Sequence, residues 1–150
     1  MPWSLTVAAL IERQGRFLFV EERDGEGPRV LNQPAGHVED GEPLLDAVVR
    51  EVAEETGLPF TPEALMGIYQ LRAPNGKDYV RVCFAGSVPP DLDASPRDAD
   101  ILGCHWLTPE ELEGRALRSG LVARCLEDLR AGRRLPLAAA DTFLDAGPRR

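Results

Sequence analysis

The chain has 150 residues, with 17 Lys and Arg against 25 Asp and Glu, and a formal net charge of −8 at pH 7. Hydrophobic residues make up 43% and charged residues 28%, so the chain can bury a core as one domain over residues 1–150. The acidic balance argues against a protein that coats DNA or RNA, since such binders present a net basic face to the phosphates. We therefore expect no nucleic acid polymer as a partner, and a phosphate ligand would need a positive group other than the bulk charge.

The three cysteines indicate an intracellular environment. The chain has an odd number of cysteines, and no two of them have C-x-x-C spacing: Cys83, Cys104 and Cys125. This favours reduced thiols over a disulfide framework or a zinc ribbon. The N-terminus has no basic segment before its apolar run, and that run is shorter than the roughly 20 apolar residues of a membrane span. The sequence predicts a cytoplasmic protein without a membrane partner, and it leaves protein partners open.

The first part of the chain has the pattern of β-structure. Apolar runs at 5–11 and 17–20, separated by the polar turn 12–15, predict a hairpin. Residues 29–31 predict a short further strand that ends before Pro34. The glycine-containing segment after this proline is expected to be a loop.

A helix is predicted at 42–56, where the periodicity changes. Pro43 is expected in its first turn, and Gly57 is suited to the left-handed residue that closes a helix. The apolar residues that recur at helical spacing are Leu45, Val48, Val49 and Val52. This stripe predicts that one face of the helix packs on the core.

The second part of the chain adds another hairpin and two more helices. Residues 65–71 and 79–88 predict the hairpin, and the segment 87–100, rich in proline and aspartate, predicts an exposed loop. The elements expected after it are a strand at 101–107, a short helix from the capping box at 108–111 and a helix at 119–131. The tail after about residue 140 is expected to fray. Together these elements predict an α+β fold with a mixed β-sheet flanked by helices.

Three glutamates of the helix at 42–56 share one of its faces. Glu51, Glu54 and Glu55 lie three and four residues apart, which places them on the same side. Taken alone, such a group is typical of the solvated face of an amphipathic helix. Here the loop between Pro34 and Gly36 precedes the helix, and its carbonyls can add oxygen ligands to the carboxylates. Oxygen ligands favour Mg²⁺, with Mn²⁺ as a substitute, so the pattern predicts a divalent metal site.

The spacing over 36–58 follows the pattern G-x₅-E-x₇-R-E-U-x-E-E-x-G-U, in which U is aliphatic. Every defined position is filled, by Gly36, Glu42, Arg50, Glu51, Val52, Glu54, Glu55, Gly57 and Leu58. With average residue usage, the probability that a given window of this length matches the pattern by chance is on the order of 10⁻⁹. The segment resembles the Nudix box, the signature of the Nudix hydrolase superfamily.

Further stretches resemble one group in this superfamily, the NudJ-type Nudix phosphatases, over most of the chain. These stretches are 32–37, 100–101, 106–107, 117–119, 121–123 and 136–137. The group commonly has Trp at the position of Leu31, which leaves no stacking side chain there. Many other Nudix proteins have two glycines where this chain has Ala35 and Gly36.

The resemblance implies the Nudix α/β/α sandwich and a set of metal ligands. Glu51 and Glu55 would bind the metal together with the backbone carbonyl of Ala35. Glu54 would bind the metal or assist. The bound cation would be Mg²⁺, or Mn²⁺ as a substitute.

The other box residues would support this site. Arg50 would orient a neighbouring glutamate by ion pairing, and with Glu51, Glu54 and Glu55 it forms the implied catalytic set. Glu42 and Gly36 would hold the loop and the helix in register. One of the glutamates, or an acid later in the chain, would accept the proton of the attacking water.

Three residues outside the catalytic set are further candidates. Asp100 resembles a post-box acid that serves some Nudix enzymes as ligand or base, although a capping role is equally consistent and Asp98 competes for the position. Arg81 would reach a phosphate or lie on the surface of an edge strand. His37 would protonate a leaving group or simply be solvated in its loop.

The expected function is Mg²⁺-dependent hydrolysis of a phosphoanhydride bond in a small phosphorylated substrate. The resemblance implies nucleoside tri- and diphosphates, with release of phosphate, and the pyrophosphate ester of the thiamine pyrimidine precursor. One alternative is a house-cleaning enzyme that converts nucleoside triphosphates to monophosphate and pyrophosphate. The other is a non-catalytic nucleotide-binding module, which is disfavoured because all four box glutamates are present.

Overall fold

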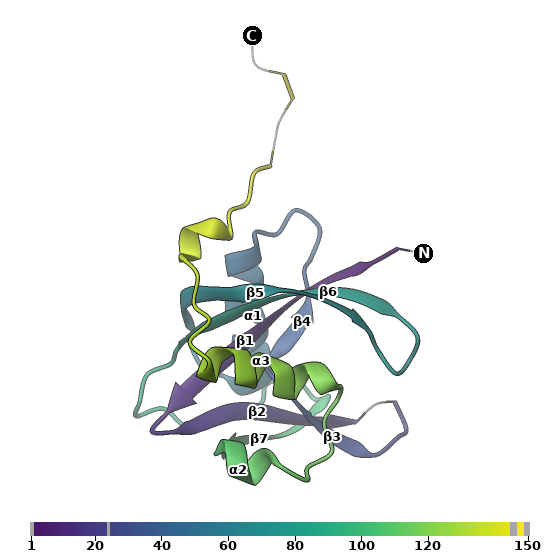
Figure 1. Ribbon diagram of the computed structural model, residues 1–150, viewed down its shortest axis with the longest axis vertical. Coiled ribbons are helices and arrows are strands. Elements are labelled where there is room, and N and C mark those ends of the chain that lie inside the picture. Colours follow the sequence, from purple (N-terminus) through teal and green to yellow (C-terminus); the bar gives the residue numbers. More distant parts are fainter. Residues whose placement is uncertain (1, 24, 145–146, 149–150) are drawn as a thin grey trace.

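The computed structural model describes residues 2–23, 25–144 and 147–148. The strands are β1 (Ser4–Arg13), β2 (Arg16–Arg23), β3 (Arg29–Asn32), β4 (Ala35–His37), β5 (Thr61–Arg72), β6 (Asp78–Ser87) and β7 (Ile101–Leu107). The helices are α1 (Leu44–Thr56), α2 (Pro109–Leu112), α3 (Gly120–Arg130) and the 3₁₀ turn η1 (Leu137–Ala139). The strands of the described residues join in one seven-stranded mixed sheet (Figure 1).

Strand β1 links the two halves of this sheet. It runs parallel to β6, which pairs in turn with β5 in the antiparallel sense. At its far end β1 continues into β2 through a tight turn in which Gln14 and Gly15 both have positive φ, as a two-residue hairpin requires. Strand β2 lies between β3 and β7, and β4 pairs with β1. Both predicted hairpins are confirmed.

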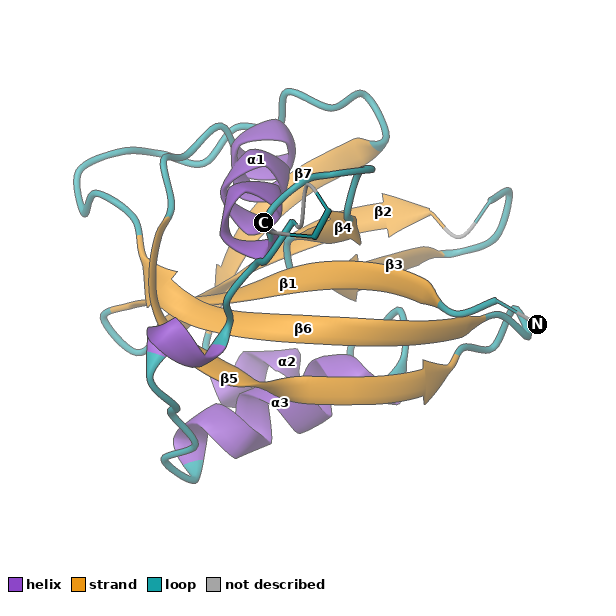
Figure 2. Cartoon of the chain, turned by 90° about the horizontal axis from the view of Figure 1, so that it is seen from above, coloured by secondary structure: helices purple, strands orange, loops and turns teal. Residues whose placement is uncertain are grey.

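The helices cover the two faces of the sheet and divide the core into two layers. Figure 2 shows α1 on one side of the strands and α2 with α3 on the other. Alternation along β1 serves both layers: Ala8 and Leu10 pack in the layer with α3, whereas Val7 and Ile11 pack in the layer with α1. The predicted α/β/α sandwich with a mixed sheet is therefore confirmed.

Helix α1 confirms the helix predicted at 42–56, with one change at its start. It begins at Leu44, and Pro43 is the N-cap residue rather than a member of the first turn. Gly57 closes the helix with φ of 72°, the left-handed conformation expected for it. A β-carbon on Gly57 would also press against the Ser95 carbonyl oxygen, so this position requires glycine on both counts.

The segment between Pro34 and the helix was expected to be a loop, and this prediction is wrong for its first three residues. Residues 35–37 form β4, which pairs antiparallel with β1 in the register Thr6↔His37 to Ala8↔Ala35. The Ala9 N–H also donates to the Pro34 carbonyl, at 2.9 Å. Three residues with a central glycine carry no local signal for a strand, because it is the distant β1 that satisfies their backbone groups.

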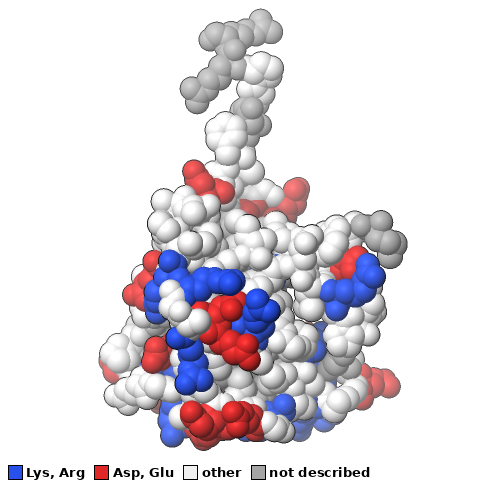
Figure 3. Space-filling model, in the orientation of Figure 1, with Lys and Arg blue, Asp and Glu red and all other residues white. Residues whose placement is uncertain are grey.

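The helical elements after β7 follow their sequence signals. Thr108 and Glu111 form the predicted capping box of α2, and Ser119 caps α3 by accepting the Leu121 N–H. Figure 3 shows that on the side of α3 the Lys and Arg side chains are interspersed with Asp and Glu.

The tail was expected to fray after about residue 140, and its first residues contact the domain. Ala140 is buried, and the Thr142 hydroxyl accepts the Leu44 N–H at the start of α1, at 3.3 Å. Phe143 and Leu144 are exposed. The rest of that prediction falls partly on residues 145–146 and 149–150, outside the described residues.

The cysteines are free thiols, as predicted: Cys83 and Cys125 are buried and Cys104 is half-buried. Within the described ranges, every helix falls short of the length and apolar character that a bilayer crossing demands. The longest of them, α1, has 13 residues.

Candidate active site

Strand β4 and helix α1 bring Ala35 close to Glu55 and Gly36 close to Glu51. Glu55, which is 7% exposed, accepts the backbone N–H of Ala35 on Oε1, at 2.8 Å. Gly36 lies directly against the Glu51 carboxylate: a β-carbon on it would be closer than 3.0 Å to all three atoms of that group. Glycine at this position therefore lets the helix carboxylate approach the strand.

Arg50 ties the glutamates of the box to one another. Its Nε and Nη2 donate to the two oxygens of Glu42 at 2.7 and 2.9 Å, and its Nη1 donates to Glu51 at 2.9 Å and to Glu54 at 3.3 Å. It also donates to the His37 carbonyl at 3.0 Å. This guanidinium lowers the pKa of Glu42 to about 2. The expected orienting role of Arg50 is consistent with this geometry, in which both carboxylate oxygens of Glu42 accept from the arginine.

Negative charge accumulates around the buried carboxylate of Glu55. Burial raises the pKa of Glu55 to about 8; the Ala35 N–H opposes this shift, and the charges of Glu22, Glu51 and Asp98 add to it. Burial also raises the pKa of Glu51, against the lowering effect of Arg50. Both carboxylates would be stabilised as anions by a cation placed between the acidic groups.

The donor set fits a hard divalent cation. In the geometry of the described residues, no three His, Cys, Asp or Glu side chains form a ready-made metal cluster, because Glu51 is turned toward Arg50 and Glu55 toward the Ala35 N–H. The groups that meet here are nevertheless oxygen donors, and the negative charges of Glu22, Glu51 and Asp98 act on the buried carboxylate of Glu55. Such donors suit Mg²⁺ or Mn²⁺ rather than a soft metal ion.

Of the two loop acids considered from the sequence, Asp98 is the one that acts on the carboxylates. Its charge raises the pKa of both Glu51 and Glu55. Its backbone N–H donates to the Glu54 carbonyl at 2.9 Å, and its own carboxylate accepts the Asp100 N–H at 2.9 Å. Asp100 instead lines a shallow groove beside β2.

The loop that carries Asp98 is fixed at several points. The N–H groups of Ser95 and Arg97 donate to the Thr56 and Glu54 carbonyls at the end of α1, at 2.8 and 3.0 Å. Farther along, the Arg13 guanidinium donates to the Pro89 and Leu92 carbonyls. The predicted loop 87–100 is thus anchored to α1 and β1.

A pocket of about 190 Å³ opens beside the carboxylates. Ala35 and Gly36 form part of its wall, and the aromatic rings of His37 and Tyr79, with centroids 6.1 Å apart, also line it. Arg81 lines it too, and the expectation of an edge-strand surface position is wrong because β6 lies between β1 and β5. His37 faces this pocket as a strand residue of β4 rather than in a loop.

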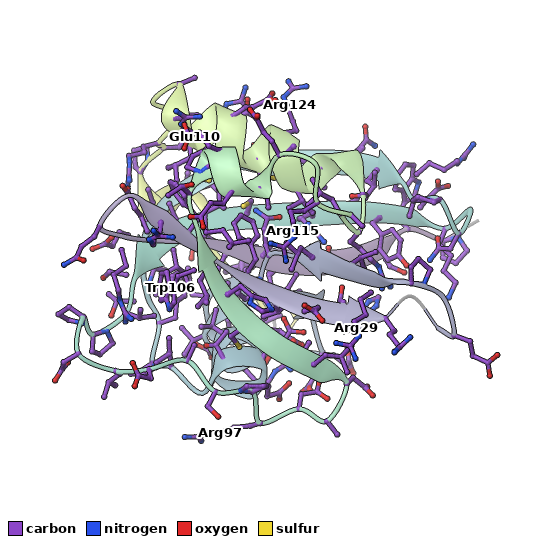
Figure 4. All side chains as sticks on the ribbon, turned by 90° about the horizontal axis from the view of Figure 1, so that it is seen from below. Arg29, Arg97, Trp106, Glu110, Arg115 and Arg124 are labelled. Carbon is purple, nitrogen blue, oxygen red and sulfur yellow. The ribbon has the colours of Figure 1, made fainter. Side chains whose placement is uncertain are left out.

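Sequence reasoning missed several other residues of this pocket. Glu22 of β2 lines it and accepts the side-chain N–H of Asn32 at 3.1 Å. Its position at a strand end within a short charged run gave no signal of a site role. Trp106, in contrast, packs with the α1 layer under the Arg13 guanidinium, 4.3 Å from its ring, and does not line the pocket (Figure 4).

Comparison with known proteins agrees with the box and with the fold. A family model described as the NUDIX domain matches residues 2–125. The chain belongs to the Nudix family. It is 38% identical over 140 residues to the phosphatase NudJ of Escherichia coli, a match that covers 93% of this chain and 91% of that protein. The same values hold for the phosphatase NudJ of Shigella flexneri.

Solved structures extend this likeness to three dimensions. A NUDIX hydrolase from Nitrosomonas europaea superposes on this Nudix chain with a TM-score of 0.87 and 40% identity, covering 95% of this chain and 98% of that one. The NUDIX domain of Shewanella oneidensis NrtR, solved as a complex with ADP ribose, has a TM-score of 0.75 and 18% identity over 88% of this chain and 89% of that one. The latter shows the shared fold alone. The chain is a Nudix hydrolase that acts on phosphorus-containing anhydrides.

Proposed function

We propose that this Nudix hydrolase uses Mg²⁺, with Mn²⁺ as a substitute, to cleave a phosphoanhydride bond in nucleoside tri- and diphosphates and related small organic pyrophosphates. The observation that carries the proposal is the buried Glu55 carboxylate, which lies among other acidic charges and is hydrogen-bonded to Ala35, in the wall of a pocket that a buried arginine also lines. The similarity to NudJ, a phosphatase by name, supports release of phosphate. The pyrophosphate of the thiamine pyrimidine precursor is part of the same proposal.

The residues that would hold the cation are Glu51 and Glu55, with the Ala35 carbonyl and Glu54. A bound divalent cation supplies positive charge against the phosphate oxygens and lowers the pKa of a coordinated water. Arg50 holds Glu51, which lies against Gly36 of β4, through a 2.9 Å hydrogen bond, and it donates to the more exposed Glu54 at 3.3 Å. The general base is one of Glu51, Glu54 and a loop acid, and the electrostatics favour Asp98 over Asp100 for the last.

The substrate enters from the side of the pocket. Ala35 and Gly36 belong both to this wall and to the backbone that contacts Glu55 and Glu51, so a phosphate held near the carboxylates has its organic part beside His37 and Tyr79. This arrangement suits a small phosphorylated molecule as the partner, and the exclusion of a nucleic acid polymer stays a prediction from the net charge of −8. The cytoplasmic location and the absence of a membrane partner stay predictions.

A substrate panel tests the proposal directly. Nucleoside tri- and diphosphates and the thiamine pyrimidine pyrophosphate are incubated with the purified protein, with Mg²⁺, with Mn²⁺ and with a chelator. Orthophosphate and pyrophosphate are assayed in parallel, and ¹⁸O-labelled water locates the attacked phosphorus. Metal-dependent orthophosphate release supports the proposal. Pyrophosphate as the sole inorganic product would favour the house-cleaning reaction, and binding without turnover would favour the non-catalytic module.

A further inference from the structure

Arg81 is a buried cation in the wall of the pocket. It lies on β6, opposite Thr6 of β1 and Tyr69 of β5 in the register of the sheet. Its strand lies between β1 and β5 in the sheet, and the residue is buried except for 9% of its surface. Since it lines the pocket, its remaining exposure is toward the space where the substrate is proposed to bind.

The protein provides Arg81 with one neutral hydrogen-bond partner. Its Nη1 donates to Gln33 Oε1 at 2.9 Å, and the fully buried Gln33 is held in turn by a contact to Cys83 Sγ at 3.7 Å. Among the residues that the structure describes, no carboxylate lies within ion-pair distance of Arg81. Within the described part of the chain, the side-chain polar atoms that are buried without a hydrogen-bond partner are Arg13 Nε and Asn32 Oδ1. No nitrogen of Arg81 is among them, so its other guanidinium N–H groups remain reachable from the pocket.

A buried guanidinium without a counter-charge is costly, because it has lost its hydration and gained little in return. Burial accordingly lowers the pKa of Arg81, while the more distant charges of Glu22 and Glu55 favour its charged form. A ligand that carries negative charge would remove this cost, whereas the edge of a neutral base would not. The planar fork of N–H donors also matches two oxygens of one phosphate group.

The position of Arg81 relative to the box makes the phosphate chain the suitable anion. Ala35 and Gly36 line the same pocket and contact the carboxylates of Glu55 and Glu51. A phosphate chain that reaches the acidic side therefore passes along a wall that also contains Arg81. Arg81 thus supplies a local positive charge for a phosphate ligand, although the protein as a whole has a net charge of −8.

We propose that Arg81 binds non-bridging oxygens of the substrate's phosphate chain and that Gln33 positions its guanidinium for this contact. Arg81 is a substrate-binding residue, and Gln33 is a positioning residue that acts through it. The inference rests on the proposed function, since it assigns one contact within the same site.

The test compares wild-type protein with Arg81→Gln and Arg81→Lys, and with Arg124→Gln as a matched control. Arg124 points outward from α3 (Figure 4) and pairs with Asp128 on the helix surface. Inorganic phosphate is titrated into each protein by calorimetry, with and without Mg²⁺, and kcat and KM are measured for ADP. Thermal unfolding verifies that each variant is folded.

We expect Arg81→Gln to weaken phosphate binding by roughly 10-fold or more and to lower kcat/KM for ADP by roughly 10- to 100-fold. Arg81→Lys, which keeps the charge but not the fork, should recover part of both losses, and Arg124→Gln should match the wild type. Phosphate affinity that is equal in wild type and folded Arg81→Gln overturns the inference. So does a loss of affinity for adenosine with phosphate affinity retained, because this would place the base at Arg81.

One further measurement covers a variant that does not fold, and the substrate panel separates failure of this inference from failure of the proposed function. If the glutamine variant does not fold, the guanidinium ¹⁵N signal of Arg81 in the wild type is followed during phosphate titration. A shift that saturates supports the contact, and an unchanged signal refutes it. If the wild type hydrolyses no member of the substrate panel, the proposed function fails, while the phosphate titration still reports on Arg81.

Discussion

Replacement of Gly36 by alanine tests the packing of strand β4 against the Glu51 carboxylate. A β-carbon at this position would lie closer than 3.0 Å to the carboxylate carbon and both oxygens of Glu51. To restore an ordinary separation of about 3.5–4.0 Å, the carboxylate must retreat by more than about 1 Å. It cannot do so freely, because it is largely buried and accepts the Arg50 guanidinium at 2.9 Å.

We expect Gly36→Ala to lower kcat by about 10²-fold, the loss associated with misplacing a site group by about 1 Å. Overpacking should also cost about 1–3 kcal/mol of stability, or roughly 2–12 °C in Tm for a domain of this size. Steady-state kinetics with Mg²⁺ and thermal unfolding measure the two effects. Gly120→Ala is the control, since a β-carbon there meets no atom within 4 Å.

A double-mutant cycle isolates the cause of the stability loss. In a Glu51→Ala background the obstructing carboxylate is gone, so Gly36→Ala should lower Tm much less than it does in the wild type. Equal Tm losses in the two backgrounds, or a Gly36→Ala enzyme with wild-type kcat, would refute the reasoning about this contact.

Three further outcomes are expected. Glu55→Gln should lower turnover by at least ~10²-fold, and full turnover in this variant would contradict the assignment of Glu55 to the site. At pH 7 without metal the variant should be no less stable than the wild type. Burial raises the pKa of Glu55 to about 8, so folding disfavours the anion that the unfolded chain carries at this pH. Arg50→Met should lower kcat and the Mg²⁺-induced rise in Tm, as it frees the glutamates that Arg50 orients; an unchanged calorimetric Mg²⁺ affinity would count against this. In the wild type, the 2.8 Å hydrogen bond from Tyr69 to Asp128 lowers the pKa of the Asp128 carboxyl. Tyr69→Phe removes this bond and should cost about 1 kcal/mol of stability at pH 7. In denaturant titrations this loss should shrink as the pH falls below 3.8, because the carboxylate that accepts the bond becomes protonated. A loss that is constant with pH would show that the phenol acts by packing alone.

The box could be predicted from sequence because its geometry is local. Helical periodicity places Glu51, Glu54 and Glu55 on one face, and the left-handed Gly57 fixes where the helix ends. The ion pairing of Arg50 with neighbouring glutamates was implied by the resemblance to the Nudix box, and it is a short-range contact for Glu51 and Glu54. The hairpins were predictable for the same reason, since turn residues and alternation lie within a few positions of each other.

What sequence reasoning missed depends on contacts between distant strands. Strand β4 exists because β1, about 30 residues earlier, satisfies its backbone. Glu22 was missed because only the order of the sheet brings it to the pocket that Arg81, already a candidate from the sequence, also lines. The choice between Asp98 and Asp100 likewise depends on which backbone N–H reaches the end of α1.

The attachment of the segment 87–100 has a consequence for how substrate is recognised. Composition predicts an exposed loop for this segment. In the structure its backbone N–H groups donate to carbonyls at the end of α1, and the Arg13 side chain donates to the carbonyls of Pro89 and Leu92. A segment that is already immobilised loses little conformational entropy when a ligand arrives, so less of the binding free energy is spent on ordering it. Asp98 is thus held beside the glutamates of α1 by contacts within the protein itself.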